Sequence, residues 1–339
     1  MGLCLAAGLS LAWSGARAAA VGEVFQQVKD SVVVIDTVYS VPVPRKPGQT
    51  ATVGGLGSGV LISEDGKIMT AAHVVQTAED MVVRFANGRK RRARVIASAP
   101  AADVALIKID TLPEGAEVAP LADSDTVKVG DQVFVVGAPY GLEHTLTVGY
   151  ISARHRPRDL TDDFVFAELL QTDAAINQGN SGGPMFNMDG QVIGIVSHIL
   201  SQSGGFEGLG FAVSANTAKD LLLDKKSFWT GAEVSLLGRG LARLLNVPQP
   251  AAILVQQVAK GSPAQAMGLR GGNVEVVIED RRLLLGGDIV LAVEGIRVKD
   301  AKSLARIQKA MQSLEPGDPL RVTVYRAGRV IELRGERPE

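Results

Sequence analysis

Cysteine is almost absent from this chain. Its 339 residues contain one cysteine, Cys4, which lies inside an apolar N-terminal segment. A single cysteine excludes an internal disulfide, and removal of that segment would also exclude thiol catalysis and cysteine-based metal sites. The chain must therefore rely on core burial for its stability, and two domains of this combined length can supply it.

Aromatic residues are also scarce, and neither positive nor negative charge is in large excess. Aromatic residues make up 4% of the chain, and the formal net charge is -1. This balance argues against nucleic acid as the main partner, because phosphate binding needs a clear excess of Lys and Arg. No P-loop is present, so ATP independence is predicted. We expect no cofactor and no metal site.

The first 20 residues have the pattern of a signal peptide. Leu3 to Trp13 is an apolar core, followed by small residues with an A-x-A pattern that ends at Ala18 or Ala20. The core is too short to span a bilayer comfortably. No Lys or Arg precedes it, so the n-region is atypical or truncated, and an apolar N-terminal helix of a cytoplasmic protein is the alternative. We expect residues 1–20 to be a signal peptide and the protein to be exported, as to the periplasm.

Residues 21–228 predict a domain of short β-strands. Apolar runs such as GVLIS, VALIKI, QVFVVGA and QVIGIVS follow one another, with turns at 64–66, 86–88 and 188–190 between runs. Asn-Gly and Asp-Gly turns between short strands are typical of antiparallel barrels or sandwiches. A second barrel is expected to start near Gly130, and residues 218–228 predict a short closing helix.

The rest of the chain has a different pattern. Residues 229–233 are the expected linker, and residues 234–339 predict a second domain of five or six strands with two helices. One helix begins after an N-cap at Ser262 and the other is the amphipathic segment 303–314. Two domains agree with the length of the chain.

The strongest chemical signal is the sequence GNSGGP at residues 179–184. A serine hydroxyl at neutral pH needs an adjacent base before it can act as a nucleophile. It also needs backbone N–H groups aimed at the oxyanion that forms on attack, and a glycine-rich loop can point successive amides into one concavity. Ser181 is the candidate nucleophile. Gly179, Asn180 and Ser181 are the candidate oxyanion-hole residues, with the amides of Gly179 and Ser181 as the expected donors.

Two upstream residues complete a catalytic set. His73 follows a strand in TAAHVV, where small neighbours leave the imidazole accessible, and Asp103 stands at the head of the apolar strand VALIKI. A partly buried carboxylate there would need the imidazole N–H as a partner. The order His, Asp, Ser along the chain is that of the two-barrel chymotrypsin-like enzymes. The alternative, three unrelated polar residues, is disfavoured because all three blocks occur in this order.

The chain resembles the HtrA/Deg family of PDZ-containing, chymotrypsin-like serine proteases. The resemblance is carried by five blocks: GSGVLISEDGKIMTAAHVV, ADVALIKID, VGDQVFVVGAPYGLEHTLTVGYIS, QTDAAINQGNSGGPMFNMDGQVIGI and GLGFAVSAN. The resemblance covers residues 21–339. It implies a mainly β fold, with a two-barrel protease domain followed by one PDZ domain, and a triad of His73, Asp103 and Ser181. It also implies a homotrimer or a multiple of trimers, and an oxyanion loop that is often misaligned until a peptide binds.

The same resemblance implies that the C-terminal domain binds extended peptides with hydrophobic C-termini by strand addition. The peptide-binding loop is expected at Leu236, Leu237, Gly238 and Arg239. Arg239 replaces the apolar residue usual in such loops, so this chain departs from the family pattern at that position. Residues 273–287 are an insertion, which we interpret as an extra hairpin near the PDZ rim.

The substrate pocket is expected to be apolar. Ala175 stands six positions before Ser181, where enzymes that cut after basic residues carry an acid, and Ile176 is beside it. Such a pocket favours small or branched aliphatic side chains. His198 and Ile199 are expected to border it, although a purely structural role for His198 is the alternative, since the sequence identifies no partner for it.

These features predict a serine endopeptidase of protein quality control and the stress response, which cleaves unfolded or misfolded proteins and is regulated through its PDZ domain. A non-enzymatic holdase or peptide-binding scaffold is one alternative, and a site-specific regulatory protease of one signalling substrate is another. Fold alone does not separate them. The intact set of Ser, His and Asp favours an enzyme over a scaffold.

Overall fold

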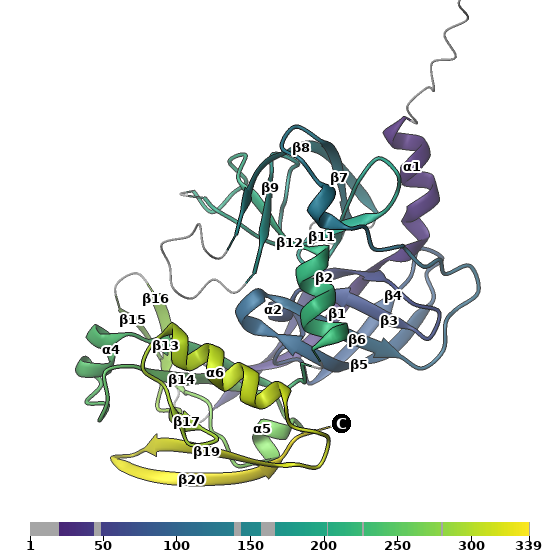
Figure 1. Ribbon diagram of the computed structural model, residues 1–339. Helices are drawn as coiled ribbons and strands as arrows, with labels where there is room; N and C mark the ends of the chain where they lie inside the picture. Colours follow the sequence, from purple (N-terminus) through teal and green to yellow (C-terminus); the bar gives the residue numbers. More distant parts are fainter. Residues whose placement is uncertain are drawn as a thin grey trace, which may run out of the picture.

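The computed structural model describes residues 20–43, 49–138, 144–156, 167–201, 203–225, 227–278 and 281–338. The expected signal peptide lies outside the described residues except for Ala20. Across these ranges, no helix combines the length and the apolar character that crossing a membrane requires. Figure 1 shows two β-barrels followed by a separate C-terminal sheet, which confirms the predicted fold class.

The first barrel closes in the strand order β1-β2-β3-β6-β5-β4. A helix, α1 (Val21–Val28), precedes it, and a short α2 (Ala72–Val75) follows β3. A single turn of 3-10 helix, η2 (Pro100–Ala102), connects β5 to β6. The strands are β1 (Val32–Pro42), β2 (Thr50–Leu61), β3 (Lys67–Thr70), β4 (Asp80–Arg84), β5 (Lys90–Ala99) and β6 (Val104–Ile109).

The second barrel closes in the order β10-β11-β12-β9-β8-β7. Helix α3 (Ala215–Lys219) and a π-helical turn, η6 (Asp220–Asp224), follow its last strand, so the closing helix begins three residues earlier than the sequence predicted. The strands are β7 (Gln132–Gly137), β8 (Thr145–His155), β9 (Leu169–Thr172), β10 (Pro184–Phe186), β11 (Val192–Ile199) and β12 (Gly210–Ser214).

Apolar residues that alternate along the strands fill each barrel and the seam between the two. Ile35, Ile68 and Ile107 are fully buried inside the first barrel. Phe134 and Phe186 stack in the second barrel with ring centroids 5.2 Å apart, and both belong to the cluster that also contains Val60 and Met69 of the first barrel. This shared core holds the two barrels in a fixed relation, so that loops from both can form one site.

The C-terminal domain is a sheet in the order β13-β14-β17-β19-β20, with the short β18 paired to β17 and a separate β15–β16 hairpin. Its strands are β13 (Ala232–Leu237), β14 (Ala252–Val258), β15 (Val274–Ile278), β16 (Arg281–Leu285), β17 (Ile289–Val293), β18 (Ile296–Arg297), β19 (Pro319–Arg326) and β20 (Arg329–Glu336). Its helices are α4 (Arg239–Leu244), α5 (Pro263–Ala266) and α6 (Ala301–Gln312). The β15–β16 pair is the hairpin expected within the insertion.

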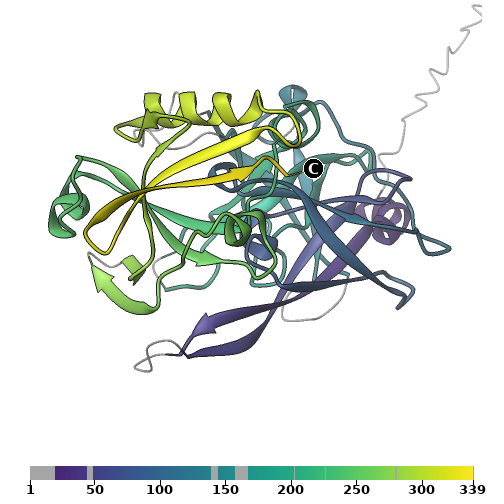
Figure 2. The same ribbon diagram turned by 90° about the horizontal axis from the view of Figure 1, so that it is seen from below.

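Helix α6 packs on the sheet through Leu304 and Ile307, which share a core with Leu320 and Val322 of β19. Seen from below, the helix runs beside the long β19–β20 hairpin (Figure 2). Strand β13 forms one end of the sheet and is paired only on its β14 side. Residues 232 and 233, assigned to the linker from the sequence, are the first two residues of β13.

Candidate active site

Asp103 is held at a sharp turn between η2 and β6. Its backbone has φ 54 and ψ 41, in the left-handed region that Asp tolerates better than most residues. Its N–H donates to the carbonyl of Pro100 at 3.1 Å. The turn ends β5 and starts β6 while directing the carboxylate toward the neighbouring α2.

His73 lies on α2 and is paired with Asp103. Nδ1 of His73 is 2.9 Å from each carboxylate oxygen of Asp103, and the backbone N–H of His73 donates to Oδ1 at 3.0 Å. Ala71 and Ala72, which precede His73, are buried, so α2 packs closely against the barrel. The carboxylate therefore fixes both the backbone and the ring of the histidine.

Ser197 on β11 is a third residue bound to this pair. Its hydroxyl donates to Oδ2 of Asp103 at 2.5 Å. Burial on its own would raise the pKa of Asp103, but the hydrogen bonds from His73 and Ser197 outweigh it and hold that pKa below its ordinary value. Asp103 is thus ionised at neutral pH. Ser197 was not among the predicted site residues, and its only signal in the sequence is a small polar residue after the apolar run 192–196 of β11.

The pKa of His73 is raised above its ordinary value of 6.5. Burial acts to lower it, but the hydrogen bond to Asp103, the charge of Asp103 and the charge of Glu233 together outweigh burial. Glu233 comes from β13 of the C-terminal domain, and burial raises its own pKa. The imidazole therefore responds to charges from both domains.

Ser181 lies on a loop that both barrels hold. The N–H of Ser58, on β2, donates to the carbonyl of Ser181 at 2.8 Å, and the N–H of Gly182 donates to Val196 on β11 at 2.7 Å. Gly182 has φ 81, and a Cβ there would lie 2.1 Å from Thr70 Oγ1. Glycine is therefore required at this position on both conformational and steric grounds.

The hydroxyl of Ser181 donates to the carbonyl of Ser197 at 3.4 Å. Within the described part of the chain it makes no hydrogen bond to His73. The three residues predicted as a triad thus converge on Ser197: its hydroxyl binds Asp103, which binds His73, and its carbonyl binds Ser181. The acid–base pair is formed, and the Ser181 hydroxyl is hydrogen-bonded elsewhere.

The three oxyanion-hole candidates differ in whether their backbone N–H groups are already hydrogen-bonded. The N–H of Asn180 donates to the carbonyl of Asn177 at 3.0 Å, so it is already engaged. Among the hydrogen bonds of the described residues, none uses the N–H of Gly179 or Ser181. Gly179 has φ 106, and its carbonyl accepts from the hydroxyl of Ser58 at 2.7 Å. The N–H groups of Gly179 and Ser181, which were the predicted donors, are thus the two without a hydrogen bond among the described residues.

The substrate-pocket candidates lie on neighbouring strands and loops of the second barrel. Ile176 is buried and packs beside Ile199 and Phe206. Gly210 faces it closely, since a Cβ on Gly210 would be 2.6 Å from Cδ1 of Ile176. These residues are apolar, as expected from the sequence, and Phe206 and Gly210 are additions that the sequence analysis did not single out.

His198 has partners that account for it structurally. Its Nδ1 is 3.0 Å from the hydroxyl of Ser197, and its ring stacks on Phe211 with centroids 5.2 Å apart. Burial lowers its pKa below the ordinary value, with the charge of Asp103 acting in the opposite direction. These contacts favour the structural alternative, in which His198 supports Ser197, which in turn holds Asp103.

The expected peptide-binding loop at 236–239 is not a loop. Leu236 and Leu237 are the last residues of β13, Gly238 is the N-cap of α4, and Arg239 is the first residue of that helix. Because successive side chains of a strand face opposite sides, Leu236 lines a cavity while Leu237 is fully buried in a different cluster. Arg239 is exposed. The strand begins at Ala232, inside the expected linker, and so residues 236 and 237, expected in a loop, form its end.

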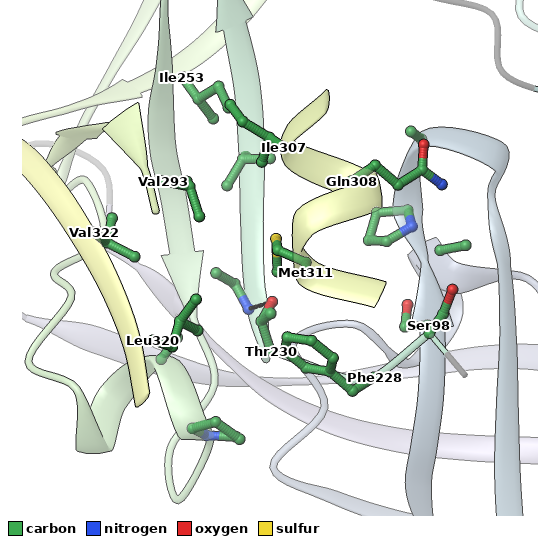
Figure 3. Close-up of a pocket in the computed structure, with 18 of the residues that line it drawn as sticks. Ser98, Phe228, Thr230, Ile253, Val293, Ile307, Gln308, Met311, Leu320 and Val322 are labelled. Carbon is green, nitrogen blue, oxygen red and sulfur yellow. Dashed lines mark hydrogen bonds between the residues drawn. The ribbon is translucent and has the colours of Figure 1, made fainter. Parts of the chain in front are cut away.

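A cavity of about 480 Å³ lies between β13 and α6. In Figure 3, Ile307 and Met311 of α6 lie near Val293 and Val322 of the sheet, and Ser98 approaches from a separate strand, β5. The lining is mainly apolar. The part contributed by the protease domain is Gln76, Ser98, Ala99, Pro100, Ala101, Ala102 and Leu221.

No group of three or more His, Cys, Asp and Glu side chains that could hold a metal ion occurs among residues with a described position.

Comparison with known families gives two matches. The model of the trypsin-like peptidase domain matches residues 57–195, and the model of the PDZ domain matches residues 208–334. The PDZ match begins just before β12 of the second barrel, whereas the C-terminal sheet begins with β13.

Curated relatives include two proteins named probable periplasmic serine endoprotease DegP-like. The one from Halomonas elongata is 36% identical over 293 residues, which are 84% of this chain and 56% of the relative. The one from Hahella chejuensis is 38% identical over 241 residues, which are 69% of this chain and 50% of the relative. The chain thus spans about half the length of the curated relatives it matches.

Solved structures of similar fold include the HtrA-type protease AlgW with a decapeptide, at 28% identity and a TM-score of 0.54, covering 95% of this chain and 100% of that one. The same protease with a tripeptide has 29% identity and a TM-score of 0.52, and covers 94% of this chain and 97% of that one. Order of motifs, barrel topology and these matches agree, and the chain belongs to the HtrA-type proteases, in which a trypsin-like peptidase domain is followed by a PDZ domain.

Proposed function

We propose that this protein is an exported, periplasmic serine endopeptidase that cleaves unfolded or misfolded proteins. The observation that carries the proposal is the convergence of His73, Asp103 and Ser181 on Ser197 at the seam of the two barrels. The names of its curated relatives, which are periplasmic serine endoproteases, support both the activity and the compartment.

The reaction proceeds by an acyl-enzyme. Oγ of Ser181 attacks the carbonyl carbon of the scissile peptide, and Nε2 of His73 takes the hydroxyl proton. The oxyanion is stabilised by the N–H groups of Gly179 and Ser181. His73 then gives the proton to the leaving amine, and a water molecule, deprotonated by the same imidazole, hydrolyses the ester. Asp103 stays ionised and stabilises the imidazolium throughout.

The pocket beside Ser181 selects small or branched aliphatic side chains. Ile176, Ile199 and Phe206 belong to one apolar cluster of the second barrel, and Ala175 offers no charge to a basic residue. An apolar pocket discriminates weakly between aliphatic side chains, by about 1–3 kcal/mol per methylene. Cleavage at many sites of an unfolded chain follows from such a pocket.

A peptide bound to the C-terminal domain regulates the protease. Strand β13 has an open edge, and the apolar cavity beside it is suited to peptide side chains. A hydrophobic C-terminal peptide would add as a strand to this edge and place its apolar side chains against α6. The solved relative was observed with a decapeptide and with a tripeptide. We carry over from the family resemblance that the active form is a homotrimer or a multiple of trimers.

The proposal is tested by labelling Ser181 with a fluorophosphonate probe and by casein cleavage, each with and without a peptide that has a free apolar C-terminus. Wild type should react and cleave, and Ser181→Ala should do neither while keeping the same thermal melt. A wild type that fails to cleave casein at every temperature and with every peptide would leave the holdase as the function.

A further inference from the structure

Gln76 connects the catalytic domain to the C-terminal domain. It is the C-cap residue of α2, three positions after His73, and it is 4% exposed. Its side-chain Nε2 donates to the carbonyl of Ala232 at 2.8 Å, and its Oε1 accepts from the hydroxyl of Ser98 at 2.7 Å. Its backbone carbonyl accepts from Nε1 of Trp229 at 3.0 Å. One buried residue thus joins the helix of His73 to β5 and to β13.

The bond to Ala232 falls on the open edge of β13. Ala232 is the first residue of β13, and its carbonyl accepts from Gln76 of the protease domain rather than from β14. The open edge carries no neighbouring strand. The amide of Gln76 therefore occupies a backbone acceptor that an added peptide strand would use.

The same residues line the cavity. Gln76, Ser98, Thr230 and Ala232 all contribute to its wall, and Figure 3 shows Thr230 near Met311, with Ser98 beyond Phe228 in the same view. Ser98 also lies two positions before η2, the turn that ends at Asp103. A peptide that fills the cavity would touch this group of residues directly.

We propose that Gln76 is a positioning residue that couples peptide binding to the catalytic pair. A peptide that adds to the edge of β13 takes the Ala232 carbonyl from Gln76. The released side chain then frees α2 to adjust with the His73–Asp103 pair intact, which brings His73 within reach of the Ser181 hydroxyl. This rests on the proposed function for its catalytic consequence, whereas the competition for the Ala232 carbonyl is independent of catalysis.

The charge of Glu233 adds an electrostatic contribution to the coupling. The charged or titratable groups that act on His73 are Asp103 from the η2–β6 turn, Glu233 from β13, and His198 from β11. Glu233 follows Ala232 directly, so a shift of the β13 edge also moves the residue whose charge acts on His73. Release of the edge would weaken the influence of Glu233 and lower the pKa of His73, while the His73–Asp103 pair stays intact.

The competition is tested by the affinity of a fluorescein-labelled decapeptide ending in Ala-Val-Leu with a free carboxylate. Full-length Ser181→Ala protein, which does not cleave the peptide, is compared with the same protein carrying Gln76→Met. Methionine matches the size of glutamine but cannot donate to the Ala232 carbonyl. Removing the internal competitor should tighten binding about threefold to tenfold, as measured by fluorescence anisotropy. Unchanged or weaker binding by folded protein would overturn the proposal.

Gln265→Met is the matched control, because the side chain of Gln265 accepts from the N–H of Gly261 in an exposed bond and does not line the cavity. Its affinity should equal that of the parent. If Gln76→Met does not fold, Gln76→Glu replaces it: the carboxylate can still accept from Ser98 but cannot donate to Ala232. Tighter binding in Gln76→Glu supports the proposal, and equal or weaker binding contradicts it.

The coupling is tested in proteins that retain Ser181. In Gln76→Met the ratio of casein cleavage with peptide to cleavage without it should fall toward one, and the acid limb of kcat/KM should move to lower pH. Glu233→Gln should move the acid limb in the same direction but keep the response to peptide. A peptide response of wild-type size in Gln76→Met would overturn the coupling. If no protein cleaves casein but the affinity shift is present, the proposed function fails and the competition for Ala232 stands.

Tryptophan fluorescence gives a separate readout of the same event. The chain has two tryptophans, Trp13 and Trp229, so Trp13→Phe leaves Trp229 as the only one. Addition of the unlabelled decapeptide should shift the emission of Trp229, because its partner Gln76 moves. The shift should be absent in Gln76→Met, and a shift of equal size there would contradict the proposal.

Discussion

The two halves of the candidate active site are held in different ways. His73 and Asp103 are fixed to each other by three contacts of 2.9–3.0 Å, and Ser197 adds a further bond to the carboxylate. The hydroxyl of Ser181 has one long bond of 3.4 Å, and that bond leads to a backbone carbonyl. The base is built in advance, whereas the nucleophile is left adjustable. A protease with this division could be switched by small movements of one loop or one helix, without rebuilding its acid–base pair.

Asp103→Asn should have the largest effect on the fixed half. An asparagine amide cannot stabilise the imidazolium and favours the wrong tautomer of His73, so kcat should fall about 10⁴-fold. The thermal melt should change little. The comparison fails if casein cleavage stays near the wild-type rate, because the acid would then be another residue. Asp173→Asn, a carboxylate that accepts from the N–H of Tyr150 in the second barrel, is the control.

Gly182→Ala breaks the adjustable half. The added methyl would lie 2.1 Å from Thr70 Oγ1 at a residue with φ 81, so the loop that carries Ser181 must shift. We expect kcat/KM to fall about a hundredfold, since a displacement of about 1 Å has that effect on reacting groups. Gly88→Ala, also at positive φ but with nothing near its Cβ, controls for backbone strain. Equal loss of activity in both variants would show that strain, not the position of Ser181, is responsible.

Ser197→Ala tests the residue at which the halves meet. It removes the hydroxyl bond to Asp103 but keeps the carbonyl that binds Ser181, so its effect falls on the fixed half alone. A hydrogen bond to a charged group contributes about 1.5–3 kcal/mol, so kcat/KM should fall at least about tenfold. Ser197→Thr, which keeps the hydroxyl, should recover part of the rate. No recovery would indicate a packing role for Ser197.

The pH dependence should show the smallest effect. His73 must be neutral to accept a proton, so kcat/KM should rise with pH as His73 loses its proton, with a midpoint above 6.5 because the folded-state pKa is raised. Glu233→Gln removes one of the charges that raise this pKa, so its midpoint should move to lower pH. A midpoint unmoved by this substitution would mean that the charge of Glu233 does not reach the imidazole.

Much of the site was predictable because local patterns determine it. The order of His73, Asp103 and Ser181, each next to a strand, was visible in the sequence, and alternating strands with tight turns indicated the barrels. Ser197 and Gln76 were not predictable in this way. The side chain of Gln76 meets Ser98 and Ala232 at separations of 22 and 156 residues, and only the folded chain brings such partners together. The start of β13 was missed for a similar reason, since pairing with β14 determines it.

The short open edge of β13 has a consequence for the association of the protein with other chains. Unpaired strand edges attract other strands and promote aggregation. Strand β13 is six residues long, and the first of its outward carbonyls is already bound by Gln76. A strand from another chain can therefore pair over only a few residues unless it displaces Gln76. So short a template limits edge-to-edge pairing, and the open edge of β13 is compatible with a protein that does not aggregate through it.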